Sequence, residues 1–380
     1  MHLHLVGGFL GSGKTTAIIG AAKLLLAHGK RVGVVTNDQG RYLVDTAFFR
    51  LAHLPTVEVT GGCFCCNYDD LAARLEQVVA DARPDVIFAE SVGSCADLVA
   101  TVVKPLLSLY ERKFAPRSFS VFADSRLLRR RLLGLEMPFS DDVVYIFDQQ
   151  LSETGLLVVN KVDLLPPAEL DDLSNRVAAR YPGRAVLYQD SLAGPDGTAI
   201  RPIFGIPDWV TLIESGSLPL PQNSLEIDYG RYAAGEAALA WLDEEIHLDG
   251  AGVGCFVQRF LSIVGARLRA ASAPVGHLKL LVRAGGLQVK LSLASAEDDG
   301  DDGEHSEDWI AAGFSAPAAL RQMFGPAEVI LNARVQMDAP ALRALVAMAL
   351  AEASLAAGVT YRETAVSFFH PSFPHPTFKF

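Results

Sequence analysis

The chain has 380 residues and a formal net charge of −11, with 50% hydrophobic and 20% charged residues. This is the composition of a folded globular protein, and its length exceeds what one hydrophobic core usually supports, so we expect two domains. The acidic balance argues against a nucleic-acid partner. No apolar stretch approaches the roughly 20 residues of a membrane helix, and we see no N-terminal signal pattern. We therefore predict a cytoplasmic protein with no membrane partner.

The first half of the chain alternates short apolar strands with helical segments, which predicts a mostly parallel sheet covered by helices on both faces. The predicted strands are 2–7, 31–36, 57–60, 85–89, 118–123, 155–159 and 185–188. The predicted helices are 14–28, 69–82, 95–111, 125–133 and 167–181. We therefore predict an α/β domain over residues 1–205.

The second half has a different pattern. Residues 206–229 are rich in Pro, Ser and Gly, which indicates a linker. Within 230–369 we predict strand 237–247, helix 253–271, strands 277–284, 287–293 and 328–336, helix 339–357 and strand 361–368. Helices interleaved with paired strands indicate a smaller α+β domain of the ferredoxin-like type.

Two segments of the second half have unusual composition. The acidic run 297–308, which contains His305, is expected to be a solvated loop rather than a weak cation site. The aromatic and His-Pro tail 370–380 is expected to lie across the protein surface, because its phenylalanines should not stay in water. Docking of a partner, or a histidine ligand role, is the alternative for this tail.

The sequence GFLGSGKT at residues 8–15 has the full spacing of a phosphate-binding P-loop, between the first predicted strand and the first helix. Backbone N–H groups in such a turn point at an anion. Lys14 would reach the β- and γ-phosphates, and the Thr15 hydroxyl would hold Mg²⁺. The remaining residues that we predict to bind the nucleotide here are Gly8, Gly11, Ser12, Gly13 and Thr16.

The sequence Asn160-Lys161-Val162-Asp163 follows the sixth predicted strand and fits a guanine-recognition pattern. Asp163 would accept hydrogen bonds from the guanine ring N–H and amino group, which adenine does not offer. Lys161 would lie over the base, and Asn160 would brace the loop. A site built around such bonds rejects an analogue that lacks them by something like 10⁴-fold, so we predict GTP. Ser191, after the next strand, could line the other side of the base.

Further polar residues follow other strands, and ligands of an open parallel sheet gather at the carboxyl ends of its strands. Asp38 lies in a loop that could become ordered on the triphosphate. Glu90 ends a strand where P-loop proteins hold a carboxylate for Mg²⁺, although a solvated acid is the alternative, and Gly93 could contact the γ-phosphate. Lys14, Thr15, Asp38 and Glu90 are thus the predicted catalytic residues.

Three of the five cysteines, Cys63, Cys65 and Cys66, fall within four positions after the third predicted strand. Such close neighbours make poor disulfide partners, so the cluster indicates a metal or redox site. Three thiolates suit zinc and leave one tetrahedral position open, with Co²⁺ and Ni²⁺ as the other candidates. Burial as small hydrophobic side chains is the alternative. Cys95 could complete the metal site, although packing is favoured for a lone cysteine.

Together these motifs resemble the CobW-like family of GTPases, relatives of the urease and hydrogenase nickel-insertion GTPases UreG and HypB. The motifs concerned are the P-loop, Asn37-Asp38-Gln39-Gly40, Gly61-Gly62-Cys63-Phe64-Cys65-Cys66, Glu90-Ser91-Val92-Gly93 and Asn160-Lys161-Val162-Asp163. The resemblance covers roughly residues 1–200. It implies a P-loop GTPase domain with slow GTP hydrolysis, coupled to binding and delivery of a metal such as zinc or cobalt. The partner would be a client metalloprotein or a cofactor-synthesis enzyme, and a homodimer is left open.

The chain departs from the family pattern at several positions. Asp38 stands where the family usually has Glu, Ser91 and Val92 replace a more usual Thr-Thr pair, and a histidine-rich tract is missing. We predict a GTP-hydrolysing metal chaperone or insertase. The first alternative is a metal-responsive switch that GTP hydrolysis only resets. The second is a small-molecule kinase. No arginine finger or base for the attacking water is evident, so turnover without a partner should be slow.

Overall fold

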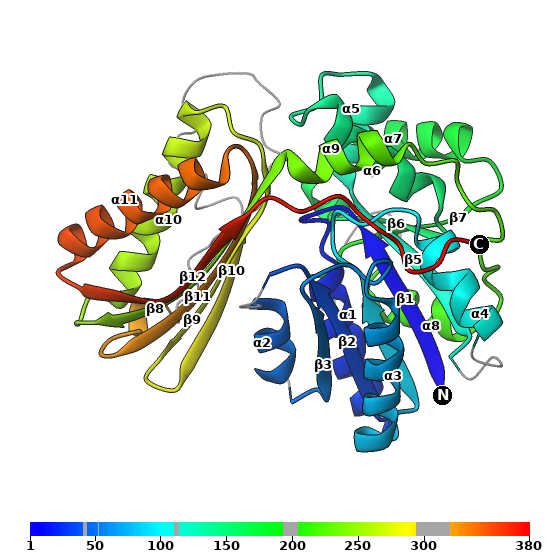
Figure 1. The fold of residues 1–380 in the computed structure, drawn as a ribbon, viewed down its shortest axis with the longest axis horizontal. Coiled ribbons are helices and arrows are strands. Elements are labelled where there is room, and N and C mark those ends of the chain that lie inside the picture. Colours follow the sequence, from blue (N-terminus) through cyan, green and yellow to red (C-terminus); the bar gives the residue numbers. More distant parts are fainter. Residues whose placement is uncertain (41–43, 52, 110–113, 193–203, 294–319) are drawn as a thin grey trace. The chain divides into compact units, whose positions relative to one another are not determined.

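The computed structural model describes residues 1–40, 44–51, 53–109, 114–192, 204–293 and 320–380 (Figure 1). The acidic run 297–308 with His305 lies outside the described residues, as do Ala193 and Gly194. The chain divides into two compact units. Unit 1 comprises Met1–Gln39, Asp45–Gly235 and Phe373–Phe380, and unit 2 comprises Gly40–Val44 and Glu236–Ser372.

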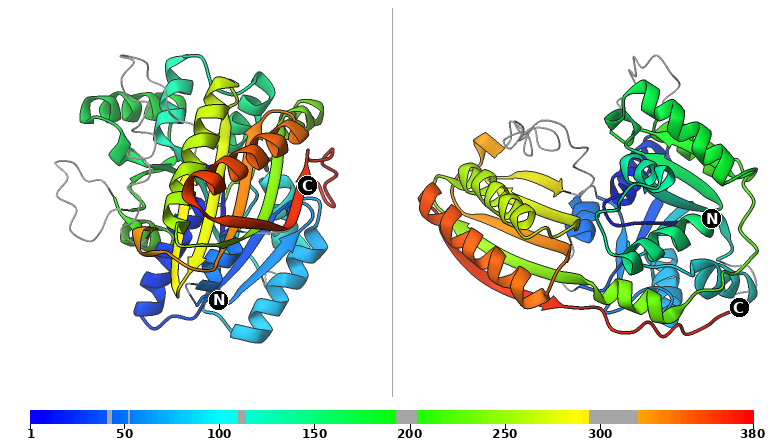
Figure 2. Two further views of the ribbon diagram at one scale, coloured as in Figure 1. Left: turned by 90° about the vertical axis from the view of Figure 1, so that its left-hand side faces the viewer. Right: turned by 90° about the horizontal axis from the view of Figure 1, so that it is seen from above.

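Unit 1 is built on a seven-stranded parallel sheet with the order β3-β2-β4-β1-β5-β6-β7. Its strands are β1 His2–Gly8, β2 Val32–Asp38, β3 Thr56–Thr60, β4 Val86–Glu90, β5 Pro116–Asp124, β6 Leu156–Asn160 and β7 Ala185–Gln189. All seven strands were predicted, with ends within two residues. The central strands are almost continuously buried because helices cover both faces of the sheet (Figures 1 and 2).

The helices up to residue 237 follow the predicted pattern in part. They are α1 Lys14–Ala27, α2 Val44–Leu51, α3 Tyr68–Ala82, α4 Lys104–Leu109, α5 Ser125–Leu133, α6 Asp141–Ser152, α7 Pro167–Arg180, α8 Ile206–Glu214 and α9 Tyr229–Ala237. Helices α2, α6, α8 and α9 were not predicted from the sequence. The predicted helix 95–111 begins only at Val99, with a π-helical turn that leads into α4.

Residues 206–229 were predicted to be a linker, but the stretch begins with α8. Pro207 lies in the first turn, where a helix tolerates proline, and Asp208 accepts a hydrogen bond from the Gly205 N–H at 2.9 Å. Trp209 is fully buried, with its ring centroid 5.1 Å from that of Phe122. The helix therefore belongs to the core of unit 1, and the proline marks its start rather than a break.

Unit 2 is an antiparallel five-stranded sheet with the order β10-β9-β11-β8-β12. Its elements are β8 Leu239–Asp249, α10 Val253–Ala270, β9 Val275–Ala284, β10 Leu287–Leu293, β11 Ala327–Gln336, α11 Ala339–Ala357 and β12 Thr360–Phe369. Without β10, the remaining strands have the βαββαβ topology of a ferredoxin-like fold, which confirms the predicted class. Strand β10 adds an edge through a hairpin at Gly285 and Gly286, both with positive φ.

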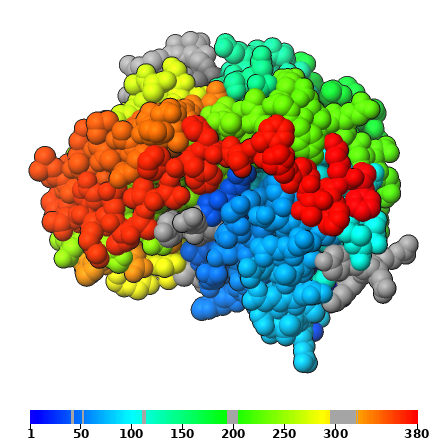
Figure 3. Space-filling view, in the orientation of Figure 1, coloured from blue at the N-terminus to red at the C-terminus, as the bar shows by residue number. Residues whose placement is uncertain are grey.

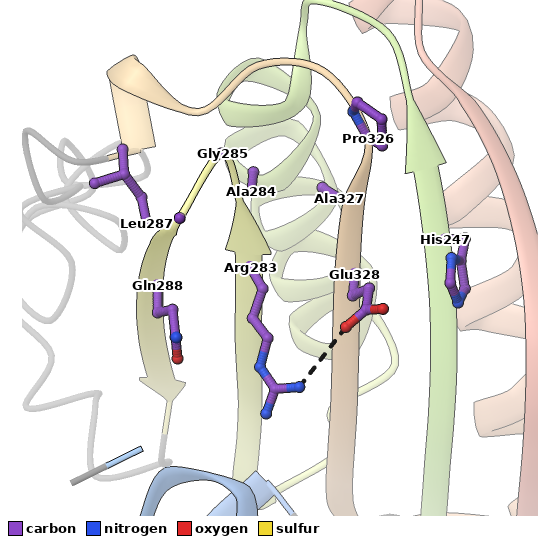
Figure 4. A pocket seen from close by; sticks show the side chains of 10 residues that line it. His247, Arg283, Ala284, Gly285, Leu287, Gln288, Pro326, Ala327 and Glu328 are labelled. Carbon is purple, nitrogen blue, oxygen red and sulfur yellow. Dashed lines mark ion pairs between the residues drawn. The ribbon is translucent and has the colours of Figure 1, made fainter. Parts of the chain in front are cut away.

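Helices α10 and α11 lie on one face of this sheet (Figure 1). Helix α11 is long and apolar enough to cross a membrane by length and composition, but Leu342, Val346 and Leu350 pack into the core of unit 2. The alternation of the strands places Arg283, Glu328 and His247 on the opposite face. These three side chains line a shallow hollow in which Arg283 pairs with Glu328 at 3.7 Å (Figure 4).

Candidate functional site

The P-loop connects β1 to α1 through a backbone that only glycine adopts easily. Gly8, Gly11 and Gly13 have φ of 124°, 72° and 93°. A Cβ at Gly8 would collide with the carbonyl oxygen of Phe122, and one at Gly13 would collide with the side-chain amide of Asn160. The glycines of the motif are therefore fixed by conformation and by close neighbours.

The side chains of Lys14 and Thr15 lie at the start of α1. Lys14 Nζ donates to the carbonyl oxygens of Gly8 at 2.7 Å and Phe9 at 3.1 Å, so its amine lies over the loop. Thr15 Oγ1 donates to Glu90 Oε1 at 2.8 Å. A hydroxyl and a carboxylate oxygen side by side are hard donors of the kind that Mg²⁺ prefers. The pair fits a magnesium ion beside the phosphate loop.

Gly93 lies in the loop after β4 and packs against the P-loop. A Cβ at this position would lie 2.7 Å from Leu10 Cδ2 and 3.1 Å from Leu10 Cα, so a side chain would push the two loops apart. Gln150, from α6, donates to the carbonyl oxygens of Gly93 at 3.0 Å and Cys95 at 2.8 Å. The loop after β4 is thereby held against the phosphate loop, at the place where Gly93 was predicted to contact a γ-phosphate.

Asn160 joins the P-loop to the loops after β6 and β7. Its Nδ2 donates to the carbonyl oxygen of Ser12 at 2.8 Å, and its Oδ1 accepts from Ser191 Oγ at 2.7 Å. Gln189 donates to the same Ser191 hydroxyl at 2.8 Å. Asn160 is 1% exposed, so its bond to Ser12 is shielded from water. Asn160 thus connects these three loops, and its role beside a bound guanine stays a prediction.

Lys161 and Asp163 follow on the same loop. Lys161 has φ of 61°, a left-handed conformation, and its Nζ lies 3.0 Å from Asp124 Oδ2. Burial alone would raise the pKa of Asp124, but the charges of Lys161 and Arg126 lower it to about 2. Partial burial and the charge of Asp190 raise the pKa of Asp163, whose side chain reaches solvent. Asp124 was not predicted from the sequence, although it ends a strand as Glu90 does.

The three cysteines after β3 converge in a tight turn. Gly61 has φ of 75°, and the N–H groups of Cys66 and Asn67 both donate to the carbonyl oxygen of Cys63, at 3.1 and 2.9 Å. Cys66 Sγ lies 3.4 Å from Cys63 Sγ and 3.6 Å from Cys65 Sγ. Three sulfurs grouped in this way would be a donor set for a thiophilic metal if all three were thiolates.

Cys63 and Cys65 form a disulfide in this structure, with their Cα atoms 5.4 Å apart. The expectation that such close neighbours pair poorly is therefore wrong here. The reason is the turn, which brings the two Cα atoms to a separation common among disulfides. Reduction of this pair would provide three thiolates. The metal site predicted from the sequence would therefore require the reduced pair.

Asn37 connects the end of β2 to the cysteine turn. Its Nδ2 donates to the carbonyl oxygens of Val59 at 3.2 Å and Gly62 at 2.7 Å, and its Oδ1 accepts from the Phe64 N–H at 2.8 Å. Asp38, the next residue, ends β2 opposite Thr60 of β3. Asn37 belongs to a motif recognised in the sequence, but no role was predicted for it. The structure shows that it holds the backbone on either side of Cys63.

The C-terminal tail lies across unit 1, as the sequence predicted (Figure 3). Thr377 donates from its N–H to the Cys65 carbonyl oxygen at 2.8 Å and from its hydroxyl to that of Cys66 at 2.9 Å. The ring of Phe378 lies 5.2 Å from that of Tyr68, at the start of α3. Lys379 Nζ lies 3.7 Å from Asp97. The tail is thus hydrogen-bonded to the cysteine turn, and no sequence motif predicted this contact.

The structure leaves two candidate ligands outside the cysteine cluster. Cys95 is fully buried and is not among the groups of side chains whose ligand atoms converge in the described ranges. Packing therefore explains it better than a ligand role. His370 accepts a hydrogen bond from the Ala339 N–H at 3.1 Å and so caps α11 in unit 2.

The family model for the CobW/HypB/UreG nucleotide-binding domain matches residues 2–188. A urease accessory protein UreG of Aliarcobacter butzleri is 31% identical over 175 residues, which are 44% of this chain and 77% of the relative. The chain belongs to the CobW/HypB/UreG family. The fold of unit 1 and the motifs at its strand ends are those expected of a nucleotide-binding domain in this family.

Two further relatives are named zinc chaperones. CobW of Sinorhizobium sp is 28% identical over 203 residues, which are 46% of this chain and 55% of the relative. YeiR of Escherichia coli strain K12 is 30% identical over 174 residues, which are 43% of this chain and 47% of the relative. The chain thus spans about half the length of these zinc chaperones.

Proposed function

We propose that this protein is a GTP-hydrolysing metallochaperone that couples its nucleotide state to the binding and delivery of a transition metal. The observation that carries the proposal is the pair of hydrogen bonds by which Asn37 joins the end of β2 to Gly62 and Phe64. A side chain next to the predicted γ-phosphate loop therefore holds the backbone of the predicted metal loop. The family membership and the zinc-chaperone names of relatives support the same reading.

The nucleotide would bind at the P-loop. Backbone N–H groups from Gly8 to Thr16 would face the phosphates, and Lys14 would move from the carbonyl oxygens of Gly8 and Phe9 to the β- and γ-phosphates. Thr15 and Glu90 would hold Mg²⁺, which neutralises charge on the phosphate oxygens when bound. Gly93, held by Gln150, would present its N–H to the γ-phosphate.

Guanine selectivity would come from the loop after β6. Asp163 would accept two hydrogen bonds from the base, and Lys161, fixed by Asp124, would lie against the ring. Ser191 would support the base through Asn160. We expect slow hydrolysis without an activating partner, because the proposed catalytic residues Lys14, Thr15, Asp38 and Glu90 include no arginine.

The metal is the cargo, and the reduced thiolates of Cys63, Cys65 and Cys66 would hold it. Zinc is the favoured ion, because three sulfur donors suit it and leave a fourth position through which a client could take the metal. Co²⁺ and Ni²⁺ are the other candidates. The recipient would be a client metalloprotein or a cofactor-synthesis enzyme in the cytoplasm, and a homodimer is compatible with this role.

The decisive experiment is a competition titration of reduced protein with zinc, cobalt and nickel, in GDP, in a non-hydrolysable GTP analogue and without nucleotide. We expect the dissociation constant of the tight zinc equivalent to differ about tenfold or more between the two nucleotide states, since only such a difference can drive transfer. Equal constants would contradict the chaperone. A difference without activation of any apo-client would favour the metal-responsive switch instead.

Matched cysteine variants separate the metal site from general thiol effects. Replacement of Cys63, Cys65 and Cys66 by Ser should remove the tight zinc equivalent, whereas Cys255→Ser, at an exposed cysteine of unit 2, should leave it unchanged. GTP should be hydrolysed in preference to ATP, and Lys14→Ala should abolish turnover. Phosphoryl transfer from GTP to an acceptor other than water would favour the kinase alternative.

A further inference from the structure

Two histidines of β1 and a carboxylate of α8 converge at the end of the first sheet where β1 begins, away from the P-loop. His2 Nδ1 and His4 Nε2 lie 3.0 and 2.7 Å from Glu214 Oε1, and the three ligand atoms lie within 4.8 Å of one another. His2 pairs with Val86, at the start of β4, whereas the P-loop begins six residues later. At about 3.3 Å per residue the two places are roughly 20 Å apart. We propose that His2, His4 and Glu214 form a second binding site for a divalent ion of the zinc type.

The donor set suits zinc. Two imidazole nitrogens and one carboxylate oxygen are a common protein set for this ion, with a water molecule in the fourth position. His4 is fully buried, but His2 and Glu214 are partly exposed, so that position can face solvent. Metal–ligand bonds of about 2.0 Å at a tetrahedral angle place the donor atoms about 3.3 Å apart. The present spacings of 3.0 and 2.7 Å to Glu214 would therefore need to open by about 0.3 and 0.6 Å.

A neighbouring hydroxyl orients the buried histidine. Ser118 Oγ lies 2.8 Å from His4 Nδ1. Without metal, the 2.7 Å contact with the Glu214 carboxylate needs a proton on Nε2. A zinc ion would replace that proton, and Nδ1 would then carry the proton and donate to Ser118. Metal-bound histidines usually have such a partner at the second ring nitrogen, which fixes the tautomer.

Arg117 opposes the site in part. Its Nε and Nη2 donate to the Glu214 carbonyl oxygen at 3.2 and 2.7 Å, and its Nη1 lies 3.3 Å from His2 Nε2. A metal on His2 Nδ1 would place a proton on Nε2, so the contact with Nη1 would have to be given up. The guanidinium charge also repels a cation. We therefore expect this site to fill after the cysteine cluster and with lower affinity.

A purely structural explanation exists, in which these hydrogen bonds only tie α8 to β1. The two explanations differ in one measurable respect, because a structural cluster binds no ion. The proposed site shares no ligand with the nucleotide loops or the cysteine turn. Its success or failure is therefore separate from that of the proposed function.

The test uses untagged protein in which Cys63, Cys65 and Cys66 are replaced by Ser, so that the thiolate site is absent. Zinc is titrated in competition with a chromophoric chelator. We expect one equivalent at micromolar free zinc, a loss of affinity on the order of 100-fold in Glu214→Gln and about 10-fold in Ser118→Ala. His28→Ala, at an exposed histidine after α1, should bind as the parent does.

Absence of saturable zinc binding in the parent would overturn the proposal, as would equal binding by the parent and Glu214→Gln. Circular dichroism shows whether each variant is folded. If Glu214→Gln is not folded, the ring-nitrogen NMR shifts of the parent decide. On addition of zinc we expect shifts at His2 Nδ1 and His4 Nε2, and unchanged shifts at both nitrogens would reject the site.

Discussion

The buried carboxyl of Glu153 is expected to make the stability of unit 1 depend on pH. Glu153 follows α6 and is 2% exposed. Its Oε2 accepts a hydrogen bond from the Val99 N–H at 3.1 Å, but its Oε1 has no hydrogen-bond partner within the described ranges. Burial raises the pKa of Glu153 from 4.5 to about 8, against the effect of the Val99 N–H and with a contribution from the charge of Asp97.

The sign of the pH dependence follows from this raised pKa. The unfolded chain loses the Glu153 proton near pH 4.5, whereas the folded protein keeps it until about pH 8. The stabilisation is therefore fully present below the unfolded pKa and is lost as the pH rises toward 8. Each pH unit in this window costs about 1.4 kcal/mol, so the whole window corresponds to roughly 5 kcal/mol as an upper limit.

Glu153→Gln should remove this dependence, because glutamine keeps the shape and the acceptor for the Val99 N–H but cannot ionise. We expect the free energies of unfolding of the variant and the wild type to agree within about 1 kcal/mol near the lower end of the window. Near pH 8 the variant should be several kcal/mol more stable. Urea unfolding followed by circular dichroism measures both, with Glu226→Gln, at an exposed position, as the control. Parallel pH profiles for wild type and Glu153→Gln would refute the reasoning.

Three further variants test the site. Asn160→Ala should lower kcat/KM for GTP by roughly 10- to 100-fold, because a buried bond to Ser12 is lost, and an unchanged value in steady-state assays would contradict the bracing role. Glu90→Gln should raise the Mg²⁺ concentration needed for half-maximal hydrolysis by about tenfold or more, and an unchanged requirement would remove Glu90 from the metal. Thr377→Val keeps the tail's shape but loses one bond to the cysteine turn, so zinc should bind about fivefold more weakly to reduced protein, with Thr211→Val as an exposed control.

The strands of the first sheet and the loops at their carboxyl ends were predicted well, because both follow from the local pattern of apolar and polar residues. Short β-branched runs mark buried parallel strands, and polar residues just past them must share one edge of the sheet. The register confirms this: Asp38 pairs with Thr60, and Asn160 pairs with both Asp124 and Gln189. The ferredoxin-like order of unit 2 also followed from the sequence of strands and helices.

What the sequence could not provide are contacts between residues far apart in the chain. Thr377 lies more than 300 positions from Cys66, and nothing in either local sequence signals the bond between them. Helix α8 was missed because its proline and flanking glycines resemble a linker, and only the burial of Trp209 shows otherwise. The Cys63–Cys65 pair depends on the turn geometry rather than on spacing.

The contacts around the cysteine turn are sufficient in size for nucleotide-controlled metal affinity. A tenfold change in affinity requires about 1.4 kcal/mol, which is close to the net contribution of one buried hydrogen bond. Asn37 makes one buried and one partly buried bond to the backbone beside Cys63. Thr377 makes two to the carbonyl groups that follow it, of which the hydroxyl bond is exposed. If the loop of Asp38 moves on GTP binding, loss of one Asn37 bond would be enough to change zinc affinity tenfold. Asn37→Ala should therefore abolish the difference in zinc affinity between GDP and the GTP analogue while leaving a zinc equivalent bound, and a retained difference would show that the coupling runs elsewhere.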